Sequence, residues 1–273
     1  MNTKRTPVPI TPANFPISKE PYDPPGFRLI EDYKTTGKFK DGVVALFSLK
    51  ENGDNKYMQL LFSGETNREY YSGKAPRSGT ADIPYRTMHT PAVISRQEGE
   101  AWHRPFIVLF EPFKGSNNYT VDKIVASGNT GRGDFLALQV YNKNKTEQLI
   151  LQTLNTAVLH KQADWQFQGS FGVINIEKGR PTYLYLGHGK SVSYKQYTVE
   201  SKTSDGSVNL VIDQNKMLIS CNQESTISIK ETGGKTVTMI NNGKATQLPI
   251  KRSGTNLSFI VPAGMNLAEI RIK

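Results

Sequence analysis

The sequence has very little cysteine and no long apolar run. Among its 273 residues there is one cysteine, Cys221, so no internal disulfide can form. The alternating context LISCNQE around it predicts a small core residue rather than a nucleophile. No apolar stretch approaches the length of a membrane-spanning helix, and the N-terminal MNTKRTPVPITPANFPISKEPYDPP lacks the apolar segment of a signal peptide. We therefore expect no membrane association and, for a chain complete as given, a cytoplasmic location.

Motifs that hold metals, nucleotides or catalytic nucleophiles are also missing. The four histidines, His89, His103, His160 and His188, are far apart and lack the close spacing of zinc ligands. There is no phosphate-binding glycine loop, no dinucleotide fingerprint and no nucleophile elbow. The sequence therefore predicts neither a metal site nor a cofactor.

Charge is the main compositional feature that is present. Lys and Arg outnumber Asp and Glu by 34 to 24, giving a net charge of +10, and the excess is spread along the chain rather than gathered in a tail. Such a balance favours acidic partners, which include nucleic acid and acidic polysaccharide. Signatures of nucleic-acid-binding folds are absent, so a nucleic-acid-binding β protein rests on charge alone.

Short strand-like runs separated by turn signals fill the chain after the first residues. Seven of the 15 prolines lie in the first 25 residues, which predicts an extended leader over 1–26. Runs such as VVALFSL (43–49), DFLALQVYN (134–142) and WQFQGSFGVINI (165–176) indicate strands, and RPFIVLFE (104–111) indicates a strand buried on both faces. We expect an all-β protein, with a large antiparallel β-sandwich segment over 27–195 and a small β-sandwich or meander over 196–273.

The stretch REYYSGKAPRSG (68–79) is the best local candidate for a site. Its glycines and proline predict a long loop rather than one regular element. Arginine pairs with carboxylates and sulfates, and flat aromatic rings suit sugars. The candidate residues for binding a polyanion or carbohydrate are Arg68, Tyr70, Tyr71, Lys74, Arg77, Arg86, Arg96, Trp102, His103 and Arg104. The alternative is a polar loop that packs across a sandwich end, with Arg68 paired to Glu65 or Glu69.

With these residues laid out, the chain resembles the C-terminal part of heparinase II/III-family polysaccharide lyases. The resemblance runs from about Gly26 to about Lys190 and is specific at EYYSGKAPR and at GEAWHRPF. It includes TEQLILQT and FGVINIEKGRPTYLYLGHG and is weaker from there to Lys273. It implies a large β-sandwich followed by a small β domain, in enzymes that cleave acidic polysaccharides by β-elimination and are exported. The family's catalytic residues lie in an N-terminal helical domain and the first part of the sandwich, and its H-x-H-x-D motif does not occur here. No catalytic residue is carried over.

The resemblance predicts a non-catalytic β-sandwich portion of a lyase system, structural and able to bind acidic polysaccharide. We expect no lyase activity from the isolated chain. The predicted partners are acidic polysaccharide and either an upstream lyase-like polypeptide or further copies of the chain. The resemblance implies a periplasmic or extracellular location. An active lyase acting on uronate-containing or sulfated glycans, and a nucleic-acid binder, remain as alternatives.

Overall fold

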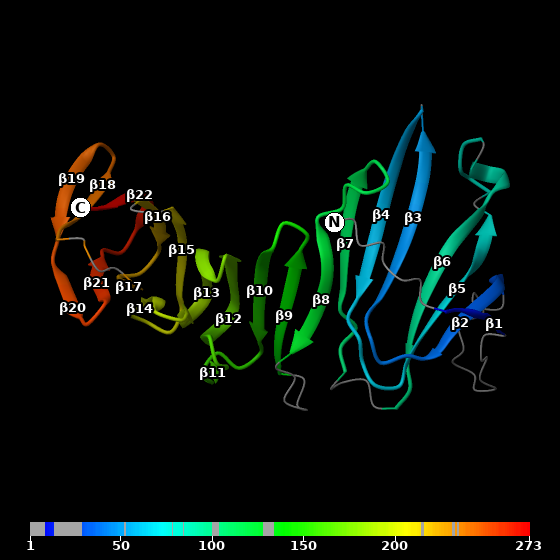
Figure 1. Cartoon of the computed structure of the whole chain (residues 1–273), viewed down its shortest axis with the longest axis horizontal. Coiled ribbons are helices and arrows are strands. Elements are labelled where there is room, and N and C mark those ends of the chain that lie inside the picture. Colours follow the sequence, from blue (N-terminus) through cyan, green and yellow to red (C-terminus); the bar gives the residue numbers. More distant parts are fainter. Residues whose placement is uncertain are drawn as a thin grey trace. The chain divides into compact units, whose positions relative to one another are not determined.

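The computed structural model describes residues 9–13, 29–51, 53–77, 79–83, 85–99, 104–127, 134–213, 216–230, 233 and 235–273 (Figure 1). Apart from one 3-10 turn, η2 (Tyr85–Thr87), every regular element in these residues is a strand. The strands pair antiparallel, so the predicted all-β fold class is confirmed. The described residues contain no helix that is long and apolar enough to span a membrane. Most of the expected leader over 1–26 lies outside the described residues.

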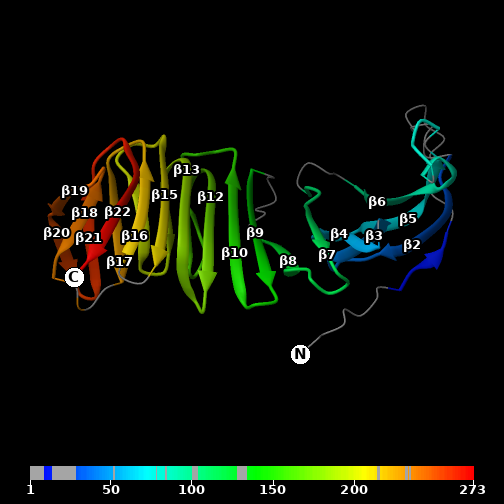
Figure 2. The same ribbon diagram turned by 90° about the horizontal axis from the view of Figure 1, so that it is seen from above.

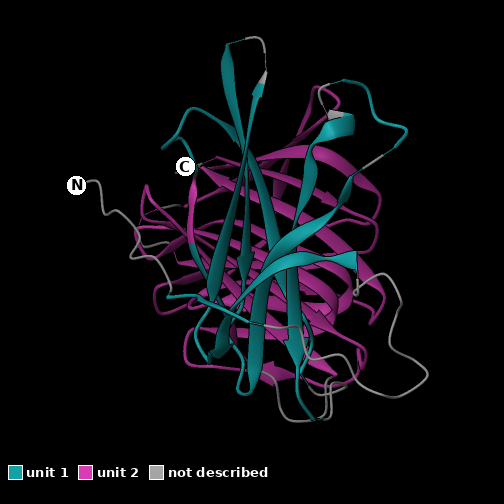
Figure 3. Cartoon of the chain, turned by 90° about the vertical axis from the view of Figure 1, so that its right-hand side faces the viewer, with its two compact units in different colours: residues 1–119, 123–125 teal, residues 120–122, 126–273 magenta. Residues whose placement is uncertain are grey.

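The chain divides into two compact units, coloured separately in Figure 3. Unit 1 comprises residues 1–119 and 123–125, and unit 2 comprises residues 120–122 and 126–273. This division differs from the predicted boundary at residue 195. That boundary falls in a turn between two paired strands, and hydrogen bonds continue across it.

Unit 1 contains two sheets among the described residues. A four-stranded sheet has the order β1-β2-β5-β6, and a three-stranded sheet has the order β3-β4-β7. The strands are β1 (Thr11–Pro12), β2 (Glu31–Lys38), β3 (Val43–Glu51), β4 (Asp54–Phe62), β5 (Arg68–Arg77), β6 (His89–Gln97) and β7 (Val108–Lys114). The sheets meet where Tyr70 of β5 packs edge-on against Phe62 of β4, with ring centroids 5.4 Å apart. The Tyr70 hydroxyl also donates to the carbonyl of Ser63 at 3.0 Å.

Two sequence-based predictions are wrong in unit 1. The stretch over 68–79 was predicted to be a loop, but its residues 68–77 form β5, an inner strand paired with β2 and β6. Its proline, Pro76, lies at a register shift between Ala75 and Arg77. Strand pairing at this position does not require the backbone N–H that proline lacks. The run 104–111 is only partly a strand, since β7 begins at Val108, and Phe110 is 62% exposed rather than buried.

Unit 2 is built on one long run of paired strands, seen side by side in Figure 2. Its order is β19-β18-β22-β16-β15-β13-β12-β10-β9-β8. The strands of this run are β8 (Val121–Ser127), β9 (Phe135–Asn142), β10 (Thr146–Thr153), β12 (Trp165–Glu177), β13 (Arg180–Tyr194), β15 (Gly206–Asp213), β16 (Lys216–Cys221), β18 (Val237–Asn241), β19 (Lys244–Leu248) and β22 (Met265–Ile272). Off this path lie β11 (His160–Lys161), β14 (Tyr197–Ser201), β17 (Ser225–Lys230), β20 (Ile250–Ser253) and β21 (Asn256–Val261).

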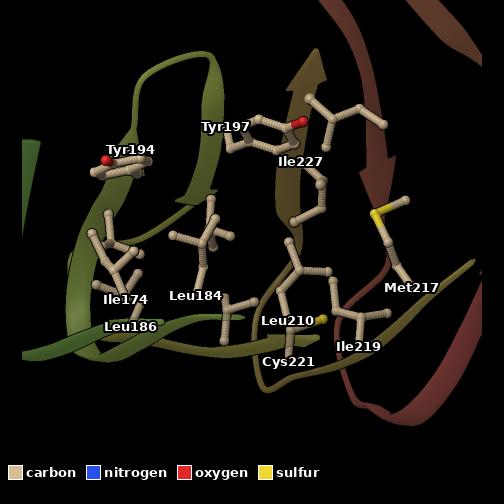
Figure 4. Packing of buried hydrophobic residues seen from close by; sticks show 14 of the residues in the cluster. Ile174, Leu184, Leu186, Tyr194, Tyr197, Leu210, Met217, Ile219, Cys221 and Ile227 are labelled. Atoms are coloured by element: carbon tan, nitrogen blue, oxygen red, sulfur yellow. The ribbon is translucent and has the colours of Figure 1, made fainter. Parts of the chain in front are cut away.

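A single hydrophobic core joins these strands into a sandwich. Buried residues of the long run, such as Leu210 and Ile219, share one cluster with Ile227 of β17 and Leu257 of β21 (Figure 4). Each fully buried aliphatic side chain contributes about 1.5–3 kcal/mol by leaving water. Cys221 is 4% exposed and belongs to this cluster, so its predicted core position is confirmed.

Gly169 of β12 and Gly189 of β13 lie opposite each other and allow the two strands to approach closely. A Cβ on Gly189 would lie 2.6 Å from the carbonyl oxygen of Gln168 and would overlap Gly169. The register of β12 with β13 also shifts here, between Gln168 and Gly169. The two backbones therefore approach more closely than any larger residue would allow.

Candidate functional site

The candidate binding residues do not form one cluster, because β5 is extended. Its two ends, Arg68 and Arg77, are separated by nine residues, or about 30 Å along the strand. Arg96 and Arg104 lie near the Arg68 end, whereas Arg86 of η2 lies near the Arg77 end. Trp102 and His103 lie outside the described residues.

Arg68 is a buried internal contact rather than a surface cation. Its side chain is 1% exposed. The guanidinium donates to Oε1 of Gln97 at 3.0 Å, to the carbonyl of Arg104 at 2.9 Å and to the carbonyl of Pro105 at 3.3 Å. It also lies 4.5 Å from the centre of the Phe106 ring, and burial lowers its pKa from the ordinary value. Arg68 therefore ties β5 to the segment before β7 and offers no group to a ligand.

The two tyrosines beside it are also used internally. Tyr70 is 3% exposed and donates to the Ser63 carbonyl, and burial raises the pKa of its phenol. Tyr71 is 5% exposed, and its hydroxyl donates to Oε2 of Glu69 at 2.9 Å. Burial, then the bond and charge of Glu69, raise the pKa of Tyr71. Neither ring presents a flat face to solvent.

Two of the exposed candidate cations are paired with carboxylates. Lys74 Nζ lies 2.5 Å from Oδ2 of Asp32, and this contact raises the pKa of Lys74 and lowers that of Asp32. Arg96 Nη1 lies 3.5 Å from Oε2 of Glu69. Both pairs are largely exposed on the cation side, so solvent screens them strongly and they can exchange partners.

The end of the β5–β6 hairpin retains the most accessible cations of the candidate set. Arg77 is exposed and lies opposite His89 in the ladder. Arg86 is exposed and donates from Nε to the carbonyl of Ala81 at 3.1 Å. Arg104, at the other end, is half-buried and donates to the Thr66 carbonyl at 3.3 Å. Arg77 and Arg86 are thus the residues best placed to meet an anionic polymer.

An apolar hollow of about 760 Å³ lies between the two sheets of unit 1. Its walls include Tyr33, Val43, Phe47 and Val93, and the Lys74–Asp32 pair lies at the same hollow. Phe110 of the three-stranded sheet, 62% exposed, adds to the uncovered apolar surface of this unit. Surfaces of this kind are characteristic of places that another polypeptide covers. The described residues contain no group of His, Cys, Asp and Glu that could hold a metal ion.

The match to a known family falls almost wholly on unit 2. Residues 121–212 match the endo-acting ulvan lyase C-terminal domain. Over 188 residues, or 68% of its length, the chain is 32% identical to an endo-acting ulvan lyase of Formosa agariphila. The chain spans 23% of that relative's length. No solved structure matches the chain. These findings confirm a resemblance to the C-terminal region of a polysaccharide lyase and do not confirm the heparinase II/III family.

The matched segment displays aromatic and amide side chains on the sheet face opposite the core, which the candidate set missed. Phe171 and Tyr185 pack edge-to-face with ring centroids 6.1 Å apart, and Tyr183 lies two residues before Tyr185 on the same face. On this face Gln148 Nε2 donates to Oδ1 of Asn175 at 2.8 Å. The alternation in TYLYLG was the available signal, since it places both tyrosines on one face.

Proposed function

We propose that this chain is a non-catalytic β-sandwich portion of a polysaccharide lyase that acts on ulvan or a similar acidic polysaccharide. The observation that carries the proposal is the similarity over 188 residues to an endo-acting ulvan lyase, together with the match of residues 121–212 to the C-terminal domain of such enzymes. The narrower proposal, a relative of the heparinase II/III family, rests on the EYYSGKAPR and GEAWHRPF blocks. An exported location follows from the same proposal.

The chemistry of β-elimination supports a non-catalytic role. The reaction needs a base for the C5 proton, a proton donor for the leaving oxygen and neutralisation of the uronate carboxylate. The hydroxyls of Tyr70 and Tyr71 are committed to Ser63 and Glu69, and Nδ1 of His89 lies 3.2 Å from the Ala75 carbonyl. These groups are held inside unit 1 rather than gathered around a substrate.

The structural part of the role concerns the apolar surface of unit 1. We propose that the hollow beside Val43 and Phe47, and exposed Phe110, are covered by further lyase-like polypeptide or by a second copy of the chain. Burying such surface contributes about 25 cal/mol per Å² before the entropy cost of association is subtracted. Light scattering over a range of concentrations tests the second-copy form.

The binding part of the role is assigned to the exposed cations of the β5–β6 hairpin. Exposed ion pairs contribute about 0.2–1 kcal/mol each, so combining Arg77→Ala with Arg86→Ala should weaken ulvan binding about 2- to 30-fold at low salt. Binding should also fall steeply as salt rises.

The test compares this pair with Lys161→Ala combined with Lys244→Ala, which removes the same charge from exposed positions of unit 2. Equal losses from the two pairs would show that only net charge matters. The same preparations are assayed for unsaturated uronate by ultraviolet absorbance. Product formed by the pure chain would overturn the non-catalytic assignment.

A further inference from the structure

A hollow of about 430 Å³ lies on the sheet face of unit 2 opposite the core. Strand pairing builds it, because Tyr185 of β13 lies opposite Asn209 of β15, which lies opposite Ser220 of β16. Ser207 and Asn222 also line the hollow. In the part of the chain that the structure describes, no residue lining the hollow carries a formal charge.

One edge of the Tyr185 ring rests on the sheet at this hollow. A Cβ on Gly187 would come within 2.9 Å of Cε1 and 3.2 Å of the hydroxyl oxygen of Tyr185, and both atoms belong to one edge of the ring. Residues two apart on a strand share a face, which places this contact on the side opposite the core. Phe171 of the neighbouring strand packs against the same ring, with the two ring planes at 64°.

Hydrogen-bonding groups surround this ring. Oδ1 of Asn209 is buried and has no hydrogen-bond partner among the described residues. Buried carbonyl oxygens are nearly always paired, so this side chain gains a hydrogen bond when its amide turns toward the hollow. Asn222 and Ser207 are held in place, since Ser207 N donates to Oδ1 of Asn222 at 2.7 Å and His188 N donates to Oγ of Ser207 at 3.3 Å.

We propose that this hollow binds one sugar residue of a polysaccharide through its uncharged, hydroxyl-bearing edge. The Tyr185 ring packs against the C–H face of the sugar, and the Asn209 amide turns toward the hollow and accepts a hydrogen bond from a hydroxyl. A ring with an apolar face and a polar tip, surrounded by neutral donors and acceptors, matches a sugar better than an ion or an apolar peptide. The inference rests on the proposed function, and it assigns to unit 2 a contact that is independent of the cations of unit 1.

Because the hollow is uncharged, its binding of sugar can be measured separately from binding by Arg77 and Arg86. At 1 M salt the screening length is about 3 Å, so contacts from Arg77 and Arg86 are largely lost while neutral hydrogen bonds and stacking persist. Binding of size-fractionated ulvan oligosaccharides to the full chain is therefore measured by calorimetry at 1 M sodium chloride. We expect binding that Arg77→Ala combined with Arg86→Ala leaves unchanged.

Four variants locate the site. Tyr185→Ala should weaken high-salt binding about tenfold, whereas Tyr185→Phe, which keeps the ring, should stay within about threefold. Asn209→Ala should weaken binding about tenfold without lowering the thermal midpoint, because the lost carbonyl has no partner within the described residues. Tyr183→Ala is the matched control, since it removes a tyrosine from the same face outside the hollow.

The outcomes separate this inference from the proposed function. Wild-type affinity in folded Tyr185→Ala and Asn209→Ala, or an equal loss in Tyr183→Ala, would overturn the inference. So would absent binding at 1 M salt when low-salt binding through Arg77 and Arg86 persists, and this result would leave the proposed function standing. Absence of ulvan binding at both salt concentrations would overturn both.

Discussion

Replacing Arg68 tests whether the candidate stretch 68–79 supports the fold or binds a ligand. Arg68→Ala removes a guanidinium that donates to the carbonyls of Arg104 and Pro105 and to Gln97. Each buried carbonyl left unpaired costs about 1–3 kcal/mol, and the space vacated by a fully buried side chain adds a cavity penalty. We expect the free energy of unfolding of unit 1 to fall by about 3–5 kcal/mol, from the unpaired carbonyls and the vacated volume together.

Two further variants show which contact of Arg68 accounts for the loss of stability. Arg68→Met keeps much of the side-chain volume and removes the hydrogen bonds, so it isolates the polar part of the cost. Arg77→Ala lies at the exposed end of the same strand and should change stability by no more than about 0.5 kcal/mol.

Urea unfolding measures the total loss, and hydrogen–deuterium exchange of the amides in β5 and β6 assigns it to unit 1. The exchange measurement matters because the two units need not unfold together. A loss below about 1 kcal/mol in Arg68→Ala would refute the bracing role. Weaker ulvan binding by a stably folded Arg68→Ala would restore Arg68 to the binding set.

Three further changes test unit 2. Burial lowers the pKa of His160, which stacks on Phe135 with ring centroids 3.8 Å apart, although the charge of Asp134 opposes the shift. Below the ordinary pKa of 6.5 the unfolded chain therefore binds a proton that the folded chain excludes, so stability holds above that pH. It should fall below it by well under about 1.4 kcal/mol per pH unit, because the ring is only partly buried and solvent weakens the effect. This slope should vanish in His160→Phe, as urea midpoints at pH 7 and 5.5 would show. Cys221, whose pKa burial raises, should react with a thiol reagent only after unfolding; rapid labelling of the native chain would contradict its core position. Gly189→Ala should cost about 1–3 kcal/mol in thermal unfolding because its Cβ would meet the opposing backbone, and an unchanged midpoint would count against that close approach.

Alternation along the sequence was sufficient to predict the fold class, and for a physical reason. A strand with one buried face repeats every two residues, so DFLALQVYN and WQFQGSFGVINI could be assigned to β9 and β12 from local pattern alone. The stretch 68–79 was misjudged because glycine, proline and charge are turn signals. Pairing with β2 on one side and β6 on the other overrides those local preferences.

The sites were harder to predict because they depend on contacts distant in sequence. Arg68 is buried by carbonyls 36 and 37 residues away, which no local pattern indicates. Tyr185, Asn209 and Ser220 become neighbours only through the register of β13, β15 and β16, and a shift of one residue would turn their side chains to the other face.

The two proposed polysaccharide contacts, one cationic in unit 1 and one neutral in unit 2, make a final prediction that depends on ligand length. With an oligosaccharide too short to reach both, Arg77→Ala combined with Arg86→Ala and Tyr185→Ala share no contact. Each change should then weaken binding at its own site and leave the binding free energy of the other site unchanged within about 0.3–0.5 kcal/mol. A long ulvan chain that engages both contacts forms the second one at a high effective concentration. Losing either contact removes this gain, so each change alone should weaken binding of the long chain strongly. Calorimetric titrations of short and long fractions, at the same low salt, measure both cases. A change at one site that alters the affinity of the other site for the short fraction would refute their independence.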